Sequence, residues 1–200
     1  MLDKIILFCG KAGSGKTTLS NLLHNKLVDK GLPCFKHSFS TPLKQMLGDL
    51  LQADFVNNAD LKNESVIFKD KLISCRSLLQ NLGDIVRSID KDYFSKHVCF
   101  ELKHYKKGIV IIDDLRFYNE LTHLLSFSKY LYIVGIDSAN ANNDNSAELS
   151  HSSENYDELK DFVKRFQLKH DSVAWLELES YKTRNTNADK AVLLDFVCNG

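Results

Sequence analysis

G-K-A-G-S-G-K-T at residues 10–17 decides the fold of this chain, because it fits the phosphate-loop pattern G-x-x-x-x-G-K-[ST]. Its glycines allow successive backbone N–H groups to point inward at a phosphate chain. Lys16 is expected to reach the outer phosphates, and the Thr17 hydroxyl can hold Mg²⁺. A glycine-rich turn that binds nothing would explain neither side chain. The residues expected to bind the nucleotide are Gly10, Ala12, Gly13, Ser14, Gly15, Lys16, Thr17 and Thr18.

The surroundings of this loop fit the same interpretation. Residues 4–9 form an apolar run typical of a strand, and residues 17–28 place four leucines on one face of a predicted helix. The loop would therefore end at a helix N-terminus, where unpaired N–H groups and the helix dipole both favour an anion.

Strand-like and helical stretches alternate along the rest of the chain. The predicted strands are 34–39, 109–112, 130–136 and 173–178, and the predicted helices start at Pro42 or span 76–87, 91–105, 120–127, 155–168 and 188–197. Residues 53–71 are polar and mixed and predict no element. Together with the phosphate loop, the alternation predicts an α/β phosphate-loop fold, a mainly parallel sheet with helices on both faces, and ligands at the carboxyl ends of the strands.

Composition narrows the class of protein. The 200 residues suggest a single domain over 1–200, and the 26 basic and 26 acidic side chains give no broad electrostatic grip on DNA or RNA. Five cysteines with no C-x-x-C pair indicate buried thiols, not a disulfide framework or zinc site. No apolar stretch is long enough to span a membrane. We expect a soluble, cytoplasmic protein, compatible with a homodimer, whose partners are small-molecule nucleotides and not nucleic acid or membrane.

Two acids, Asp113 and Asp114, follow the most apolar predicted strand. Phosphate-loop enzymes commonly hold Mg²⁺ with an acid at such a place, so we expect at least one of the two in the site. The alternative is that one of them caps the next helix. Arg116 lies at the same edge and could either neutralise transferring phosphate or pair with one of the acids.

The predicted helix 76–87 carries four side chains that could clamp an anionic acceptor. Arg76 and Arg87 are eleven residues apart, about three turns, and so lie near one face, while Gln80 and Asp84 are four apart. Arginine binds phosphate in a bidentate manner. The alternative is an ordinary solvated helix face. Lys44 could likewise reach substrate phosphate or be merely solvated.

The polar run 138–150 is too polar to pack and predicts a mobile surface loop. With residues 151–154 it could form a lid over the site at 138–154. His151 could act from such a lid, but an acceptor phosphate is already anionic and nucleophilic, so no general base is required. Ser152 or Ser153 could instead cap the following helix.

Several segments together resemble the phage-type deoxynucleoside monophosphate kinases, in the order of that family. They are G-K-A-G-S-G-K-T at 10–17, F-S-T-P-L-K at 39–44, R-S-L-L-Q-N-L-G-D-I-V-R at 76–87, I-I-D-D-L-R-F-Y-N-E at 111–120 and H-S-S-E at 151–154. The L-L-Q-x-L-G element followed by D-x-R-F-x-N-E is the most specific part. Two positions depart from the family: Asp113 doubles the acid, and Thr17 stands where the family usually has Asp, which favours Thr–Mg²⁺ ligation.

This resemblance implies transfer of a phosphoryl group from ATP, with Mg²⁺, to a deoxynucleoside monophosphate. It also implies a phosphate-loop kinase fold, supports Arg76, Gln80, Arg87, Asp114 and Arg116 as site residues, and places residues 151–154 in a closing segment. With the motifs above, the expected catalytic residues are Lys16, Asp114 and Arg116, the expected metal ligands are Thr17 and Asp114, and the expected substrate-binding residues are Lys44, Arg76, Gln80, Asp84 and Arg87. A kinase of another small phosphorylated metabolite on the same fold is the first alternative. A nucleotide-binding switch without acceptor kinase activity is the second, although the chain lacks the N-K-x-D motif of typical GTPases.

Overall fold

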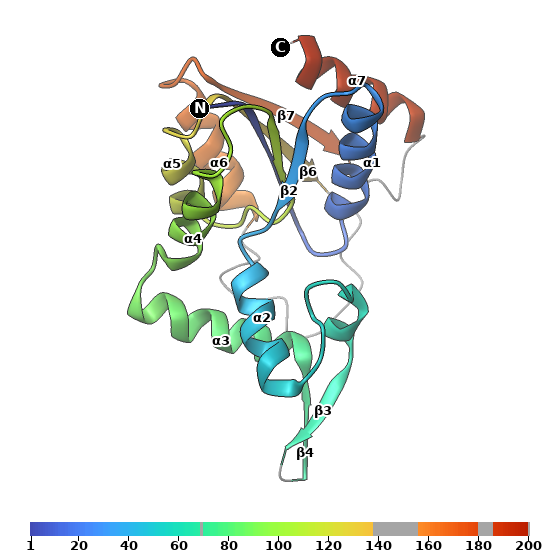
Figure 1. Ribbon diagram of the computed structural model, residues 1–200, viewed down its shortest axis with the longest axis vertical. Coiled ribbons are helices and arrows are strands. Elements are labelled where there is room, and N and C mark those ends of the chain that lie inside the picture. The colour runs from blue at the N-terminus through green and yellow to red at the C-terminus, as the bar shows by residue number, and fades with distance from the viewer. Residues whose placement is uncertain (69, 138–155, 180–185, 200) are drawn as a thin grey trace.

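The computed structural model describes residues 1–68, 70–137, 156–179 and 186–199 (Figure 1). Five parallel strands form the main sheet in the order β2-β5-β1-β6-β7. Their bounds are β1 (Leu2–Gly10), β2 (Cys34–His37), β5 (Ile109–Ile112), β6 (Ser128–Asp137) and β7 (Val173–Glu179). The predicted α/β phosphate-loop fold with a mainly parallel sheet is confirmed, and β1 lies at the centre of the sheet.

Helices cover both faces of this sheet and enclose two apolar cores. On one face lie α1 (Lys16–Asp29) and α7 (Thr186–Asn199), and on the other α4 (Tyr93–Leu102), α5 (Tyr118–Leu124) and α6 (Tyr156–Gln167) (Figure 1). Ile6 and Phe8 of β1 are buried in the first core, while Ile5 and Leu7 are buried in the second. Because neighbouring residues of a strand point to opposite faces, a strand buried on both faces reads as a continuous apolar run.

Residues 41–89 form an arm that extends beyond the carboxyl edge of the sheet (Figure 1). The arm contains α2 (Thr41–Leu51), the short 3₁₀ helix η1 (Ala59–Asn63), an antiparallel hairpin of β3 (Ser65–Phe68) and β4 (Lys71–Ser74), and α3 (Cys75–Ile89). Leu47, Phe55 and Cys75 are buried in a small third core inside it. The arm therefore carries its own apolar cluster, separate from the two cores of the sheet.

Most predicted elements agree with the structure to within a few residues, whereas η1 and the hairpin fall in the stretch 53–71 that gave no prediction. The strand predicted to reach Phe39 ends at His37, because the chain turns there into α2. Cys9, Cys34, Cys75 and Cys99 are buried free thiols as expected, but Cys198 is exposed, so that the prediction of five buried thiols is wrong at this position. The predicted lid at 138–154, including His151, lies outside the described residues.

None of the described helices is long and apolar enough to cross a membrane.

Candidate functional site

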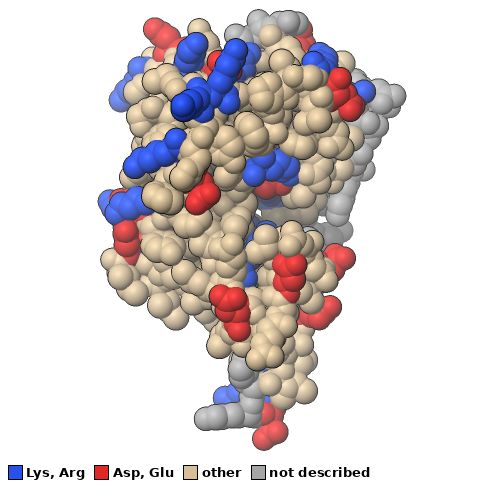
Figure 2. Space-filling model, in the orientation of Figure 1, with Lys and Arg blue, Asp and Glu red and all other residues tan. Residues whose placement is uncertain are grey.

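A cavity of about 640 Å³ lies between the carboxyl edge of the sheet and the arm. Figure 2 shows the hollow between these two parts of the molecule. The sheet side contributes residues of the phosphate loop and of the segment after β5, and the arm contributes residues of α2, η1 and α3. The predicted site residues that line it are Ala12, Gly13, Gly15, Lys16, Thr17, Thr18, Lys44, Arg76, Gln80, Arg87, Asp114 and Arg116.

The phosphate loop curls between β1 and α1. Gly10, Gly13 and Gly15 have φ angles of 148°, 73° and 95°. A Cβ atom on Gly10 would come within 2.5 Å of the Ile136 carbonyl oxygen, so β6 leaves no room for a side chain there. Gly10 and Ser14 shape the loop from behind and do not line the cavity, and Ser14 is buried.

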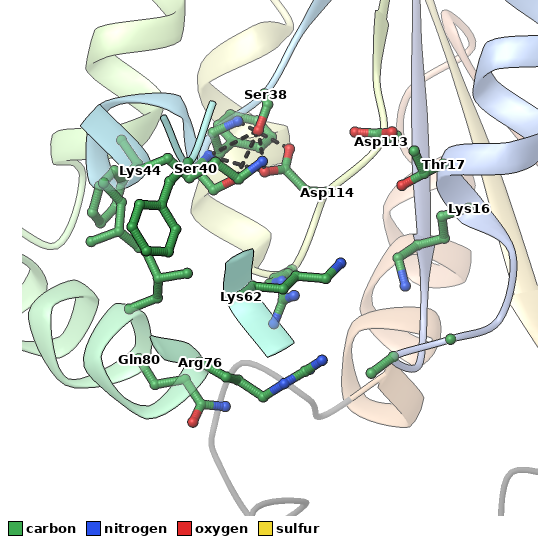
Figure 3. Close-up of a pocket in the computed structure, with 18 of the residues that line it drawn as sticks. Lys16, Thr17, Ser38, Ser40, Lys44, Lys62, Arg76, Gln80, Asp113 and Asp114 are labelled. Atoms are coloured by element: carbon green, nitrogen blue, oxygen red, sulfur yellow. Dashed lines mark hydrogen bonds between the residues drawn. The ribbon is translucent and has the colours of Figure 1, made fainter. Parts of the chain in front are cut away.

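The Lys16 amine lies against the loop itself. Its Nζ donates to the carbonyl oxygens of Gly10 at 2.6 Å and Lys11 at 2.7 Å. Figure 3 shows Lys16 and Thr17 on the sheet side of the cavity, facing the arm. Since α1 begins at Lys16, the unpaired N–H groups of its first turn also open toward this space. The loop thus offers backbone donors and one cation to the same small volume.

Asp113 lies on the phosphate-loop side of the site, beside Thr17 (Figure 3). Its Oδ2 accepts a hydrogen bond from the Ser20 hydroxyl at 3.0 Å and forms an ion pair with Lys36 Nζ at 3.4 Å. A hydroxyl and a carboxylate are hard oxygen ligands, and Mg²⁺ is usually held by one or two such groups together with phosphate oxygens and water. Thr17 and Asp113 therefore fit a magnesium ion bound with a nucleotide.

Asp114 lies on the arm side of the site. Its carboxylate accepts hydrogen bonds from the Ser38 hydroxyl at 2.6 Å and from the backbone N–H groups of Phe39 at 3.0 Å and Ser40 at 2.9 Å. These bonds hold the turn that leads from β2 into α2. The role of Asp114 as a metal ligand stays a prediction.

Neither acid caps the next helix, so the helix-cap alternative is wrong. The N-cap of α5 is Phe117, three residues after Asp114. The buried Glu120 carboxylate closes this helix end, since its Oε2 accepts from the N–H groups of Arg116 at 2.9 Å and Phe117 at 3.0 Å. The pKa of Glu120 is raised to about 7, mainly by burial and further by the negative charge of Asp114. The hydrogen bonds from the Arg116 and Phe117 N–H groups and the positive charge of Arg87 act in the opposite direction and lower it.

One face of α3 forms the far wall of the cavity. Arg76 Nη2 donates to the side-chain oxygen of Asn63 at 3.2 Å, and Gln80 lies next to it on the helix (Figure 3). The Arg87 guanidinium lies 4.2 Å from the centre of the Phe117 ring and 4.8 Å from that of Phe94. Such stacking fixes the plane of a guanidinium while its edge stays able to bind an anion.

Asp84 does not join the predicted clamp. It is exposed and does not line the cavity. The face of α3 that meets the cavity carries Arg76, Leu79, Gln80 and Arg87. Asp84, five residues after Leu79, is rotated by about 140° from it. Its spacing from Gln80 alone was therefore a poor guide.

Lys62 and Asn58 also line the cavity, although no sequence pattern marked either residue. Partial burial lowers the pKa of the Lys62 amine, and the positive charges of Arg76, Lys44 and Arg116 lower it further. The surrounding sequence is polar and lacks periodicity, so no pattern distinguished this lysine from a solvated one. Cations from α2, η1, α3 and the segment after β5 thus surround one part of the cavity.

Residues 1–133 match a family model described as an AAA domain. No curated protein sequence matches the chain. This family match agrees with the phosphate-loop class that residues 10–17 predict, and it does not single out the deoxynucleoside monophosphate kinases.

The solved structures to which this chain is similar are distant from it. The APS kinase CysC of Mycobacterium tuberculosis in complex with AMPPNP and APS is 14% identical, with a TM-score of 0.41, over 98% of this chain and 97% of that chain. A shikimate kinase from Bacteroides thetaiotaomicron is 13% identical, with a TM-score of 0.38, over 98% of each chain. A cobyrinic acid a,c-diamide synthase from Mycobacterium smegmatis with bound ATP analog and magnesium is 15% identical, with a TM-score of 0.46, over 96% of this chain and 81% of that chain.

Proposed function

We propose that this chain, which belongs to the AAA domain family, is a phosphate-loop kinase that transfers the γ-phosphoryl group of ATP to a deoxynucleoside monophosphate. One observation carries this proposal. The phosphate loop and a second set of cations, Lys44, Arg76 and Arg87, line the same cavity from opposite sides. A protein that only bound ATP would need the first set but not the second.

The sheet side of the cavity would bind the donor. The loop N–H groups and Lys16 would hold the β- and γ-phosphates, as the loop geometry favours. Thr17 and Asp113 would hold Mg²⁺ with the nucleotide, and the ion would neutralise charge on the phosphate oxygens. We prefer Asp113 to Asp114 as the metal ligand, because the Asp114 carboxylate already accepts three hydrogen bonds from the turn before α2.

The arm side would bind the acceptor. Arg76, Arg87 and Lys44 supply positive charge for its phosphate, and Arg76 and Arg87 come from the face of α3 on which the predicted Gln80 also lies. Apolar side chains at the same side, Phe39, Leu43, Phe55, Leu79 and Phe94, offer a surface for a ring system. Gln80 and Asn58 add amide groups that can both donate to and accept from a base.

The chemistry would need position and charge more than proton transfer. An oxygen of the acceptor phosphate attacks the γ-phosphorus, a new P–O bond forms, and the bond to the β–γ bridging oxygen breaks and leaves its electron pair on ADP. The attacking oxygen is already anionic, so no side chain has to remove a proton. Lys16 and Arg116 line the cavity on either side of this path and would stabilise charge on the moving group.

A kinase of another small phosphorylated metabolite is the main alternative, because arginines recognise a phosphate whatever group carries it. The deoxynucleotide acceptor is favoured by the resemblance of residues 76–87 and 111–120 to the phage-type family. ATP consumption measured across deoxynucleoside and ribonucleoside monophosphates, APS and shikimate would decide. We expect turnover with one or more deoxynucleoside monophosphates and little with the two other metabolites. The reverse order would overturn the assignment of the acceptor.

A further inference from the structure

Lys62 reaches into the cavity from a part of the arm that is firmly anchored. Leu61 packs against the small core of the arm, and the side chain of Asn58 caps η1 by accepting from the Asp60 N–H at 3.1 Å. The Cys75 N–H donates to the Glu64 carbonyl oxygen at 2.9 Å and ties the end of this segment to the start of α3. The backbone of Lys62 is therefore held on both sides, while its exposed side chain lines the cavity.

The same segment also positions Arg76. Asn63, the residue after Lys62, accepts a hydrogen bond from the Arg76 guanidinium at 3.2 Å. The two cations are thus connected through one side chain and lie on the same side of the cavity. Figure 3 shows Lys62 extending from the arm in the direction of Lys16, and the Arg76 side chain extending from α3 into the same cavity.

The positive side chains around Lys62 favour the binding of an anion. Partial burial lowers the pKa of its amine, the positive charges of Arg76, Lys44 and Arg116 lower it further, and the negative charge of Asp60 raises it. Like charges that share a cavity repel each other, and the repulsion is relieved when a multiply charged anion binds between them. All four cations line the cavity, so such an anion would contact them from within it.

We propose that Lys62 is a catalytic residue of this kinase, which binds the acceptor phosphate on the side that faces ATP and stabilises the phosphoryl group during transfer. This inference rests on the proposed function. In the transferred state the γ-phosphoryl group has left the bridging oxygen of ADP and is bonded to the acceptor oxygen, between the phosphate loop and the arm. A cation that reaches from η1 toward the phosphate loop would contact the moving group in this gap, together with Arg76, which extends into the same cavity from α3.

Steady-state kinetics of Lys62→Ala test the proposal, with ATP and the best deoxynucleoside monophosphate varied separately. We expect kcat to fall by at least about 30-fold and the KM for ATP to change by less than about 2-fold, because the effect lies on the acceptor side of the transition state. Lys62→Arg should recover much of the loss. Lys71→Ala, an exposed lysine on the hairpin of the same arm, is the matched control and should behave as the wild type.

Thermal unfolding of the free variants separates this role from a structural one. Removing a cation from a repelling group leaves Lys62→Ala at least as stable as the wild type, whereas a lysine that supports the arm would lower Tm when removed. An unchanged kcat in Lys62→Ala, or a loss of activity that accompanies a lowered Tm, would overturn the proposal.

The proposal can also be separated from a failure of the proposed function. If the wild type turns over no monophosphate, the kinase assignment fails. Calorimetry with inorganic phosphate then tests Lys62 directly, in the presence of a non-hydrolysable ATP analogue that occupies the phosphate loop. If Lys62→Ala weakens phosphate binding and Lys71→Ala does not, Lys62 is an anion-binding residue. Equal binding by the two variants overturns that role as well.

Discussion

The two sides of the cavity are built in different ways. The donor side is a loop between a central strand and a helix, and its anion-binding groups are mainly backbone N–H groups placed by three glycines with positive φ. The arm side brings together single cations from α2, η1 and α3 above a small core. Binding by backbone needs a fixed local pattern, whereas binding by side chains needs only that separate segments converge. The donor side can therefore be predicted from a local sequence motif, whereas the arm side forms only when separate segments meet in the folded protein.

The largest effect is expected on the donor side, with Lys16→Ala. The Lys16 amine is held by two carbonyl oxygens of the loop, and its charge matters most while charge moves onto the leaving phosphate. We expect kcat to fall by about 10²–10³-fold, comparable with the loss of one preorganised transition-state donor. Thermal unfolding should be unchanged within error. A variant that keeps more than about a tenth of the wild-type kcat would show that the loop does not work in this way.

The next effect concerns Glu120, which lies where the two sides meet and holds the backbone of Arg116 and Phe117. Its pKa is raised from 4.5 to about 7, so the folded protein binds this proton more tightly than the unfolded chain. The contribution to stability is therefore complete below about pH 4.5 and is lost as the pH rises through 7, by about 3 kcal/mol in all.

Glu120→Gln keeps an amide oxygen for the two N–H groups and removes the titration. The free energy of unfolding of the wild type should drop between about pH 4.5 and pH 8.5 by about 3 kcal/mol more than that of the variant. Chemical denaturation of both proteins at the two pH values measures this difference. The same drop in both proteins would mean that Glu120 does not titrate in this range.

On the arm side, Arg76→Ala and Arg87→Ala should each raise the acceptor KM by about 10- to 150-fold, which corresponds to about 1.5–3 kcal/mol for a lost charge-assisted contact. The KM for ATP should change little. Arg87→Lys is a useful companion variant, because it keeps the charge but loses the stacking on Phe94 and Phe117. If either Ala variant raised only the KM for ATP, that arginine would bind the donor and not the acceptor.

A smaller effect distinguishes the two neighbouring acids. Asp113→Asn should raise the Mg²⁺ concentration for half-maximal activity by about 10-fold with little change in Tm. Asp114→Asn should instead lower Tm, because it weakens the bonds to Ser38, Phe39 and Ser40. Magnesium titrations and thermal unfolding of both variants measure the contrast. A raised magnesium requirement in Asp114→Asn and a lowered Tm in Asp113→Asn would identify Asp114 as the metal ligand, which is the assignment that the family resemblance implies.

The sequence predicted the donor side well because its groups are local. The strand before the loop, the loop and α1 follow one another within residues 2–29, so their geometry is set by neighbouring residues. Arg76 and Gln80 could be placed because helical periodicity and a family resemblance both marked them. Lys62 could not, since its place depends on how η1 packs on α3 across a sequence without periodicity. Asp84 was misplaced because spacing fixes which residues share a face but not which face meets a cavity.

The central claim is that a phosphoryl group crosses from the sheet side of the cavity to the arm side. Transfer of label from γ-labelled ATP to a panel of deoxynucleoside monophosphates tests it most directly, with labelled product separated from free phosphate. We predict that the label appears in a deoxynucleoside diphosphate. The Arg76→Ala variant should form this product at the wild-type rate only when the acceptor concentration is raised. Label that appears solely as inorganic phosphate, at a rate independent of every acceptor, would contradict the claim and leave a nucleotide hydrolase or switch.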